Sequence, residues 1–456
     1  MEQTESGHNR REFVKLSAAA GLSALVGGAV GCASLNRLAD GQAREPVGQP
    51  PLDLVRIGFV GMGHQGTNHV KNLVRIKGCR ITAICDIRPE RVAAVRKIIT
   101  DAGHPEPAVY GKDDYDFARM CERNDIDLVY NAAPWRWHTP ISMTAMNNGK
   151  HAASEVNIAL SIDDCWKLVE TAETTGRFCI MQENCCYDRM EMAILNMVRH
   201  GVFGEVMHGE CGYLHDLRAL KLSPTYYQGM WRIRQSVTRN GNLYPTHGIG
   251  PMAWIMDINR GDAFDYIVSM SGNARGLNLF AKKKYPDSEW VTKRFALGDV
   301  NLSLIRTKLG KTILVKHNTN SPRPYSRGFL VQGTKGLVRK YPEQKIHLDE
   351  VSPGHQWEEF GPYGEKYEHP VWKAMRDKSR GAGHGGMDFI EDYRLITALN
   401  RGLPPDIDVY DSVAWSSIIP LSEQSVAAGS APIKFPDFTR GLWKTPRKLG
   451  VSVWTS

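Results

Sequence analysis

The stretch Val55-Arg-Ile-Gly-Phe-Val-Gly-Met-Gly-His-Gln-Gly66 decides the fold of this chain. Its first half is a short apolar run typical of a buried strand, and the pattern Gly61-x-Gly63-x-x-Gly66 follows at once. A strand that turns directly into a helix presents unpaired backbone N–H groups, and the glycines let a pyrophosphate approach them. The order of strand, glycines and helix therefore predicts a dinucleotide site, which includes His64 and Gln65 at the helix start.

A second apolar strand supports this prediction. It runs from Ile81 to Cys85 and ends at Asp86, and 86 − 61 = 25 residues is close to the offset expected for a ribose-binding acid. A carboxylate there binds the adenosine ribose hydroxyls and disfavours a 2′-phosphate, which favours NAD. Arg88 is suited to a 2′-phosphate, so NADP stays open as an alternative. A purely structural glycine turn explains fewer of these features.

Strands and helices continue to alternate as far as the strand Phe178 to Asn184, which predicts an α/β fold with a parallel sheet. Ligands of such sheets lie at the carboxyl ends of the strands. The residues expected at that edge, and so the candidates for binding the cofactor beside the glycine turn, are Asp86, Trp135, His138, Glu155, Val156 and Asn184.

Composition limits the remaining possibilities. The chain has 456 residues, enough for two domains with separate cores, and we place these at 53–186 and 187–456. The formal charge is +8, but no basic run is interleaved with aromatic residues, so nucleic acid is not an expected partner. The nine cysteines include no Cys-x-x-Cys or Cys/His cluster at metal spacing, so we predict buried free thiols and no metal site.

The first residues are predicted to be an address and not part of the fold. Arg10-Arg11 precedes an uncharged segment from Leu16 to Val30 that is rich in Ala, Gly and Leu and short for a bilayer span. This pattern resembles a twin-arginine signal over residues 1–31, followed by a linker over 32–52, and implies export to the periplasm. Ala29-Val-Gly-Cys32 also resembles a lipoprotein cleavage site, so a lipid anchor at Cys32 stays open.

The second domain is expected to be an α+β unit with an open, mostly antiparallel sheet. Four segments have the composition of its strands: Val206 to Tyr213, Ala263 to Ser271, Val300 to Thr307, and Thr312 to Asn318.

The order of these features resembles the Gfo/Idh/MocA oxidoreductases, with two departures. Val156-Asn157 stands where those dehydrogenases usually have Lys-Pro after a glutamate, and Tyr244-Pro-Thr-His247 stands where they usually have Asp-x-x-x-His. Both departures are typical of glycoside hydrolase family 109. The strings that carry this closer resemblance are Pro134-Trp-Arg-Trp-His138, Asn184-Cys-Cys-Tyr187-Asp-Arg189, Trp231-Arg232, Tyr244-Pro-Thr-His247 and Ser321-Pro-Arg-Pro-Tyr325-Ser-Arg327.

The resemblance implies a homo-oligomeric glycosidase, an α-N-acetylgalactosaminidase (EC 3.2.1.49), that uses tightly bound NAD without net oxidation. In the implied route the C3 hydroxyl of a terminal N-acetylgalactosamine is oxidised, C2 is deprotonated, the glycosidic oxygen leaves, water adds, and C3 is reduced again. Recycling of one nucleotide is consistent with export of a folded, loaded protein.

Candidate site residues follow from the same strings. His247 suits proton transfer because imidazole titrates near neutral pH, and we place it with Tyr244 at the C3 side. Tyr187 is the candidate base at C2, although the division of roles among the three stays open. The resemblance implies that the sugar is bound by Tyr213, Arg232, Tyr244, His247 and Tyr325. For Tyr213, packing in the core is the simpler alternative.

Two other functions are considered. A net NAD-dependent sugar dehydrogenase would release reduced nucleotide, but the missing lysine beside Glu155 counts against it. A non-catalytic exported binder of sugar or nucleotide would have kept only the fold. The presence of Tyr187, Tyr244, His247 and Tyr325 together counts against that alternative. The anomeric preference of the enzyme is left open.

Overall fold

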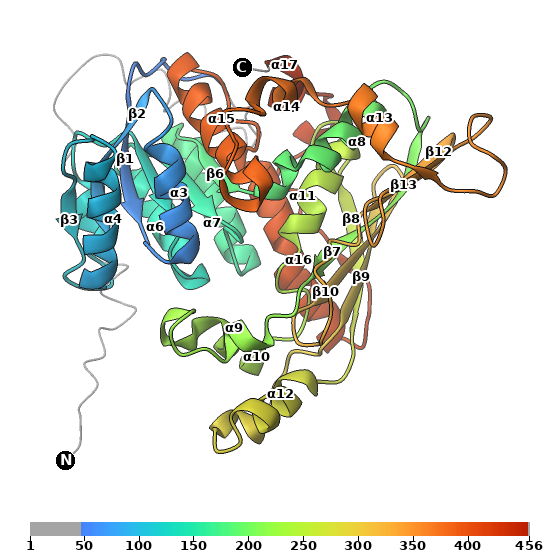
Figure 1. The fold of residues 1–456 in the computed structure, drawn as a ribbon, viewed down its shortest axis with the longest axis horizontal. Coiled ribbons are helices and arrows are strands. Elements are labelled where there is room, and N and C mark those ends of the chain that lie inside the picture. The colour runs from blue at the N-terminus through green and yellow to red at the C-terminus, as the bar shows by residue number, and fades with distance from the viewer. Residues whose placement is uncertain (1–46, 455–456) are drawn as a thin grey trace. The chain divides into compact units, whose positions relative to one another are not determined.

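The computed structural model describes residues 47–454 (Figure 1). The predicted signal peptide, Cys32 and most of the 32–52 linker lie outside the described residues. Among the described helices, none is both long and apolar enough to cross a bilayer.

The first sheet has six parallel strands in the order β3-β2-β1-β4-β5-β6. The apolar side chains of the strand β1, including Ile57 and Phe59, are buried, as the short apolar run in the sequence predicted. This confirms the predicted parallel sheet. The strands are β1 (Val55–Val60), β2 (Cys79–Cys85), β3 (Ala108–Tyr110), β4 (Leu128–Asn131), β5 (His151–Glu155) and β6 (Cys179–Gln182).

Helices connect these strands and cover the sheet. The one after β1 begins at His64, directly behind Gly63, and buries Val70 and Leu73. The one after β5 is capped by Ser161, whose hydroxyl accepts a hydrogen bond from the amide of Asp164 at 3.1 Å. The helices are α3 (His64–Leu73), α4 (Pro89–Asp101), α5 (Phe117–Cys121), α6 (His138–Asn147) and α7 (Ile162–Thr175).

The second sheet has nine strands in the order β14-β13-β12-β11-β7-β10-β9-β8-β15. Within this second sheet, β7 and β10 are the only described strands that pair in parallel, so the expected mostly antiparallel sheet is confirmed. The strands are β7 (Val206–Leu214), β8 (Phe264–Ser271), β9 (Asn301–Thr307), β10 (Thr312–Asn318), β11 (Leu330–Gly333), β12 (Gly336–Arg339), β13 (Lys345–Leu348), β14 (Glu358–Glu359) and β15 (Ile433–Lys434).

Two late helices join the sheets. α16 (Val409–Ala427) is buried along most of its length and packs against β6, α7 and β8, so it lies between the two sheets (Figure 1). α15 (Met387–Arg401) packs against α3 and against the single turn η3 (Asn184–Tyr187). Because of these contacts, side chains from the end of the chain reach the carboxyl edge of the first sheet. The other helices are α8 (Arg189–Arg199), α11 (Thr246–Ile255), α13 (Gly361–Lys366), α14 (Pro370–Met375) and α17 (Gly450–Val453).

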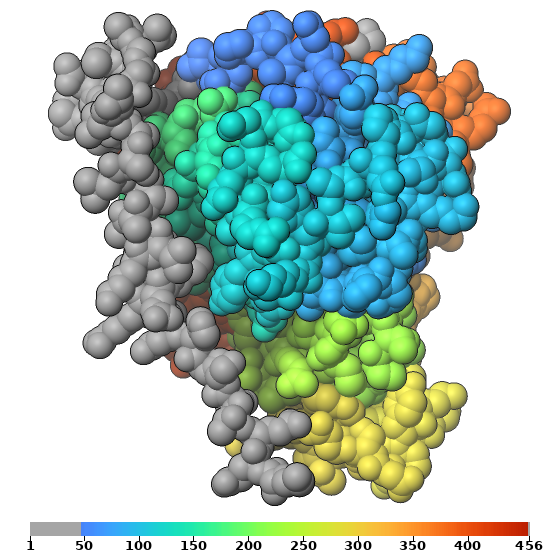
Figure 2. Space-filling view, turned by 90° about the vertical axis from the view of Figure 1, so that its left-hand side faces the viewer, coloured from blue at the N-terminus to red at the C-terminus, as the bar shows by residue number. Residues whose placement is uncertain are grey.

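Three helices that follow β7 in the sequence, with α11 and β8 between the second and the third, pack around a small core of their own. They are α9 (Arg218–Lys221), α10 (Trp231–Thr238) and α12 (Gly276–Lys284). In Figure 2 these helices (green and yellow) lie below the first domain (blue to cyan). The apolar residues that hold them together are Leu222, Ile233, Leu277, Ala281 and Phe295.

Candidate active site

The turn between β1 and α3 shows why its glycines are needed. Gly61 has a φ of +84°, and a Cβ there would lie 2.5 Å from the amide nitrogen of Ala133. A Cβ on Gly66 would lie 2.0 Å from the carbonyl oxygen of Gly61. Gly63 differs, because the nearest heavy atom to an added Cβ is a nitrogen of Arg88 at 4.0 Å. Gly61 and Gly66 therefore serve close packing, whereas Gly63 faces open space.

The N-terminus of α3 is available to an anion. Gly63 caps the helix without a side-chain hydrogen bond, so its first-turn amides face the open space above the turn. The ring of His64 lies 5.5 Å from that of Tyr226, which precedes α10. The side-chain amide of Gln65 donates to Asp388 Oδ2 at 3.2 Å.

Asp86 is held at the end of β2. Its Oδ2 accepts the amide of Met62 at 2.7 Å, and its Oδ1 accepts both the amide and Nε of Arg88, at 3.0 and 3.1 Å. The arginine that sequence analysis left as a sign of NADP is thus paired with the acid that favours NAD.

We predict that Asp86→Ser changes the cofactor preference. The substitution removes the ribose acceptor and frees Arg88, so NAD affinity should fall about 10- to 100-fold while NADP affinity rises. Equilibrium titration of both nucleotides checks this, with Asp53→Ser as the control. Unchanged affinity for both nucleotides would contradict the placement of the adenosine ribose.

The loop after β4 carries Trp135 and His138. The two ring nitrogens of His138 lie 2.7 Å from the carbonyl oxygen of Asn157 and 2.6 Å from that of Ala133. This buried ring therefore connects the loop after β4 to the loop after β5. The ring of Trp135 lies 5.8 Å from Tyr244, and it forms one wall of the cluster described below.

The last residue of β5, Glu155, presents a carboxylate at this edge. Glu155 Oε1 lies 2.7 Å from Nε2 of His69, and its Oε2 accepts the amide of Val156 at 3.2 Å. The Val156 side chain is buried. The amide group of Asn157 donates to the carbonyl oxygen of Leu243 at 3.1 Å, and so ties the loop after β5 to the Tyr244–His247 turn.

Asn184, after β6, also faces this edge. Its Nδ2 donates to Asp388 Oδ1 at 2.7 Å, while its buried Oδ1 has no partner among the described residues. With the open space at Gly63, the uncapped α3 and the held Asp86, this free acceptor shows that the residues present fit an NAD. Asp388 belongs to α15, and sequence analysis missed its part in the site.

Four of the five predicted sugar-binding residues form one compact cluster. The ring of Tyr244 lies 4.6 Å from Tyr213 and 4.8 Å from His247. The guanidinium of Arg232 lies 4.7 Å from the Tyr244 ring and 5.1 Å from that of Trp135. These aromatic rings surround the guanidinium and hold it in place, and we call this cluster the cage. The guanidinium and the tyrosine hydroxyls can donate hydrogen bonds to the polar substituents of a sugar ring, so the cage suits a sugar.

Tyr325 lies at the rim of this cluster. Its ring centroid is 6.2 Å from that of Tyr213, its hydroxyl accepts Arg327 NH1 at 3.2 Å, and it is 40% exposed. Burial raises the pKa of Tyr213 and Tyr244, and the charge of Arg232 opposes the shift without cancelling it. The pKa of Tyr325 is also raised, by the partial removal of its phenol from water. The three phenols are therefore neutral donors near pH 7.

A buried dyad lies under the cluster. Glu183, at the end of β6, is fully buried, and its Oε1 lies 2.7 Å from Nδ1 of His247. A carboxylate at Nδ1 holds the proton on that nitrogen and leaves Nε2 free to accept one. Sequence analysis missed Glu183, although its place at a strand end beside Asn184 was a usable signal.

Glu183, Cys185 and His247 also bring possible metal-ligand atoms within 4.8 Å of one another. The amide of Cys185 donates to Glu183 Oε1 at 3.1 Å, and His247 bonds the same oxygen, so we interpret the group as the dyad with a neighbouring thiol. All eight cysteines among the described residues are free and buried, as expected.

Tyr187 is not brought together with the cluster. Its hydroxyl donates to Asp406 Oδ2 at 3.1 Å, and its ring packs edge-on against Trp254 at 5.5 Å. Burial raises its pKa well above the usual value. The turn η3 therefore directs Tyr187 toward a buried ion pair of Asp406 and Arg394.

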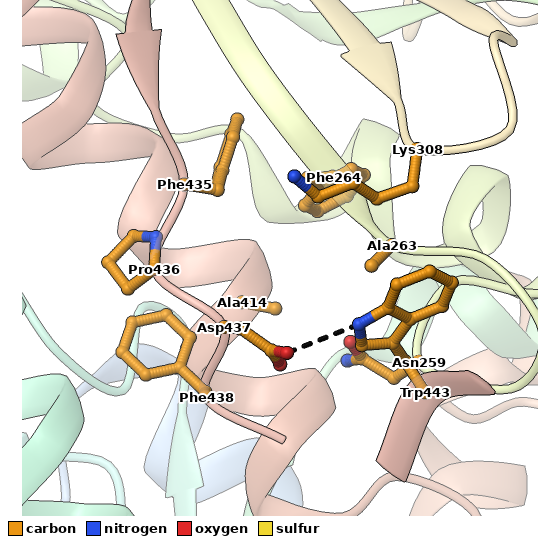
Figure 3. A pocket seen from close by; sticks show the side chains of 10 residues that line it. All are labelled: Asn259, Ala263, Phe264, Lys308, Ala414, Phe435, Pro436, Asp437, Phe438 and Trp443. Atoms are coloured by element: carbon orange, nitrogen blue, oxygen red, sulfur yellow. Dashed lines mark hydrogen bonds between the residues drawn. The ribbon is translucent and has the colours of Figure 1, made fainter. Parts of the chain in front are cut away.

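A separate cavity lies where β15 meets β8 (Figure 3). Aromatic side chains form its walls, among them Phe264, Phe435 and Trp443, and Asp437 accepts the Trp443 indole N–H at 3.2 Å. It contains none of the predicted site residues. The dyad of Glu183 and His247 lies at the edge of the first sheet with the predicted cofactor-binding residues, and we place the active site there.

Family comparisons cover most of the described chain. Residues 187–445 match the family described as glycosyl hydrolase 109, C-terminal domain, and residues 55–183 match the oxidoreductase family with an NAD-binding Rossmann fold. The chain is 43% identical to a glycosyl hydrolase family 109 protein of Saccharopolyspora erythraea, over 98% of this chain and 97% of that protein. It is 46% identical to one of Solibacter usitatus, over 96% and 98%.

Solved structures show the same fold at low identity. A levoglucosan dehydrogenase in complex with NADH and levoglucosan has a TM-score of 0.64 and 17% identity, covering 84% of this chain and all of that one. An inositol dehydrogenase homolog from Azotobacter vinelandii, complexed with NAD⁺, has a TM-score of 0.62 and 18% identity, covering 86% of this chain and all of that one.

Proposed function

The chain belongs to glycosyl hydrolase family 109 and has an NAD-binding Rossmann domain, and from this premise we propose that it is an α-N-acetylgalactosaminidase (EC 3.2.1.49). It would cleave a terminal N-acetylgalactosamine by transient oxidation at C3, loss of the C2 proton, elimination, water addition and re-reduction. One NAD per chain, tightly bound and recycled, would serve every turnover.

The observation that carries this proposal is the dyad of Glu183 and His247 beside the cage of Tyr213, Arg232 and Tyr244. Both lie at the carboxyl edge of the Rossmann sheet, which is the cofactor edge of such folds. A sugar in the cage would therefore have one proton acceptor, several hydroxyl donors and the nicotinamide side of the cofactor around it.

The residues proposed to hold NAD are distributed along that edge. The amides at the start of α3 would bind the pyrophosphate over Gly61 and Gly63, and Asp86 the adenosine ribose. Glu155, Trp135 and Asn184 would contact the nicotinamide half, with His138 and Val156 shaping the loops behind it. When bound, NAD supplies a reversible hydride acceptor at C3 of the sugar.

The proposed proton steps use the cluster residues. Nε2 of His247 takes the proton of the C3 hydroxyl as that carbon is oxidised and returns it when C3 is reduced, so the imidazole is unchanged after a full cycle. Tyr244 donates a hydrogen bond to the C3 oxygen, and Arg232 binds a polar substituent of the ring. The proton lost from C2 passes to a water molecule, and the departing glycosidic oxygen takes a proton from water, because His247 already holds the C3 proton during this step. Tyr187, the predicted base at C2, is not given this step here, because its hydroxyl is bonded to Asp406.

The alternative is a net sugar dehydrogenase, favoured by one observation: the solved structures of like fold are dehydrogenases. At under 20% identity these structures speak for the fold alone. The buried Val156 at the place of the usual lysine favours the glycosidase.

We also propose that the protein is exported by the twin-arginine route to the periplasm, with Cys32 as a lipid attachment site.

We further propose that the protein forms a homo-oligomer. Support for the oligomer is an apolar strip on the outer face of the second sheet. Met270 of β8 lies opposite Leu302 of β9, with Leu304 further along, and all three are between 46% and 64% exposed.

The test uses the protein as purified, without added nucleotide, and p-nitrophenyl α-N-acetylgalactosaminide. We expect many turnovers of phenol release with no growing NADH absorbance. Release of one NADH per sugar without phenol would overturn the glycosidase and support the dehydrogenase.

A further inference from the structure

A buried histidine lies directly behind Glu155. Nε2 of His69 lies 2.7 Å from Glu155 Oε1, and its Nδ1 lies 3.0 Å from both carboxylate oxygens of Asp392. The His69 and Asp392 side chains are fully buried, whereas that of Glu155 is 16% exposed. The three groups form a line from α15 through α3 to the cofactor edge.

Asp392 is held by hydrogen bonds from several elements. Its Oδ1 accepts the hydroxyl of Tyr130 at 2.8 Å, and its Oδ2 accepts the side-chain amide of Asn72 at 2.9 Å. With His69 this gives the buried carboxyl group three partners from three side chains. Asp392 is therefore fixed in place behind the His69 ring.

Burial and two neighbouring acidic groups determine the pKa of His69. Burial alone lowers the pKa of His69, but the charges and hydrogen bonds of Asp392 and Glu155 outweigh it and raise the pKa well above the usual value. The groups that face this line of three residues are Gln65 and Asn72 of α3, Tyr130 of β4, Glu155 at the end of β5, Asp388, Glu391 and Asp392 of α15, and His384 before it.

Two further carboxyl groups of α15 lie near this line of residues. Asp388 is paired with His384 at 2.8 Å, and although burial opposes it, this partner and Asn184 lower the pKa of Asp388 to about 2. Burial raises the pKa of Glu391 well above the usual value. His69 lies between Glu155 and Asp392 and contacts both.

His151 provides a comparison within the same sheet. It is also buried, but its Nδ1 accepts the amide of Phe178 at 3.1 Å, and burial with the charge of Arg177 lowers its pKa to about 4. A buried ring whose hydrogen-bond partner is a backbone amide and not a carboxyl group is therefore neutral near pH 7 in this protein.

We propose that His69 is a positioning residue: Asp392 holds its ring with a proton on each nitrogen, and the Nε2–H fixes the Glu155 side chain as a hydrogen-bond acceptor at the cofactor edge. The benefit to turnover rests on the proposed function, since Glu155 is there the acceptor for hydroxyl groups of the nicotinamide ribose and sugar. The protonated state of His69 does not depend on that function.

The protonation of His69 stabilises the folded chain at low pH and not at high pH. Because the pKa of His69 is higher in the folded chain than in the unfolded one, the imidazolium contributes its stability in full below the unfolded value, about 6.5. That contribution is lost as the pH rises through the folded value.

The primary experiment is ¹⁵N NMR of the full chain with labelled histidine and no substrate. At pH 7.5 we expect His69 to show two protonated ring nitrogens and His151 only one, with the His69 signals identified by their loss in His69→Gln. A neutral His69 ring at that pH overturns the proposal, whether or not the protein is a glycosidase.

Asp392→Asn provides a second test that keeps the shape of the site. We expect its His69 to lose the second proton at lower pH, and kcat to fall about tenfold or more with a smaller change in KM. Asp101→Asn, the same change at an exposed carboxylate of α4, is the control. An Asp392→Asn variant whose His69 keeps both ring protons up to the same pH as in the wild type overturns the proposal.

Discussion

Replacing His247 by glutamine is expected to lower kcat about 10²- to 10⁴-fold, because the proposed acceptor of the C3 hydroxyl proton is then absent. Glu183→Gln should have an effect of similar size, since the carboxylate no longer holds the proton on Nδ1 at 2.7 Å. Steady-state kinetics on p-nitrophenyl α-N-acetylgalactosaminide measures both.

The two variants should retain their NAD, because neither side chain belongs to the residues proposed to hold it. Nucleotide content and thermal melting therefore separate a chemical defect from a folding defect. The matched control is His208→Gln on β7, whose ring bonds Thr312 and lies outside the cluster. If His247→Gln kept wild-type kcat, the dyad would have no place in the mechanism.

Gly63→Ala is expected to abolish stoichiometric NAD while leaving the fold intact. The added methyl meets only Arg88, at 4.0 Å, so the free energy of unfolding without nucleotide should change by less than about 1 kcal/mol. The same methyl occupies the space into which the pyrophosphate must come, so NAD affinity should fall by about two orders of magnitude or more.

Denaturant unfolding of nucleotide-free protein and NAD titration check the two halves of this prediction. Gly354→Ala is the control, because that glycine also faces open space but lies in a loop far along the chain from the turn. Gly61→Ala should instead destabilise the fold, since its Cβ would lie within 2.5 Å of backbone and its φ is +84°. Normal NAD content in Gly63→Ala would move the cofactor away from this turn.

Local patterns predicted much of the fold. The glycine turn and the strand ending at Asp86 each involve groups close in sequence, and each is in place in the structure. Four of the nine described strands of the second sheet, β7 to β10, were also identified from their composition. Strand pairing was not predictable, and the parallel contact of β7 with β10 depends on the tertiary arrangement.

The parts of the site that were missed depend on residues far apart in the sequence. His69 and Asp392 are 323 positions apart, and their contact exists only because α15 packs on α3. Asp388 reaches Asn184 in the same way, over 204 positions. Tyr187 shows the opposite error: its motif is adjacent to the site in sequence, but the turn η3 directs its hydroxyl to Asp406.

The central claim is that the glycosidic bond is broken by elimination after oxidation at C3, and one measurement tests it most directly. The reaction is run in D₂O with protein as purified, and the released N-acetylgalactosamine is examined by NMR. The account predicts one solvent deuterium at C2 of each released sugar, because the C2 proton is removed and replaced in every cycle. Released sugar that keeps its original C2 hydrogen would show ordinary hydrolysis and contradict the account.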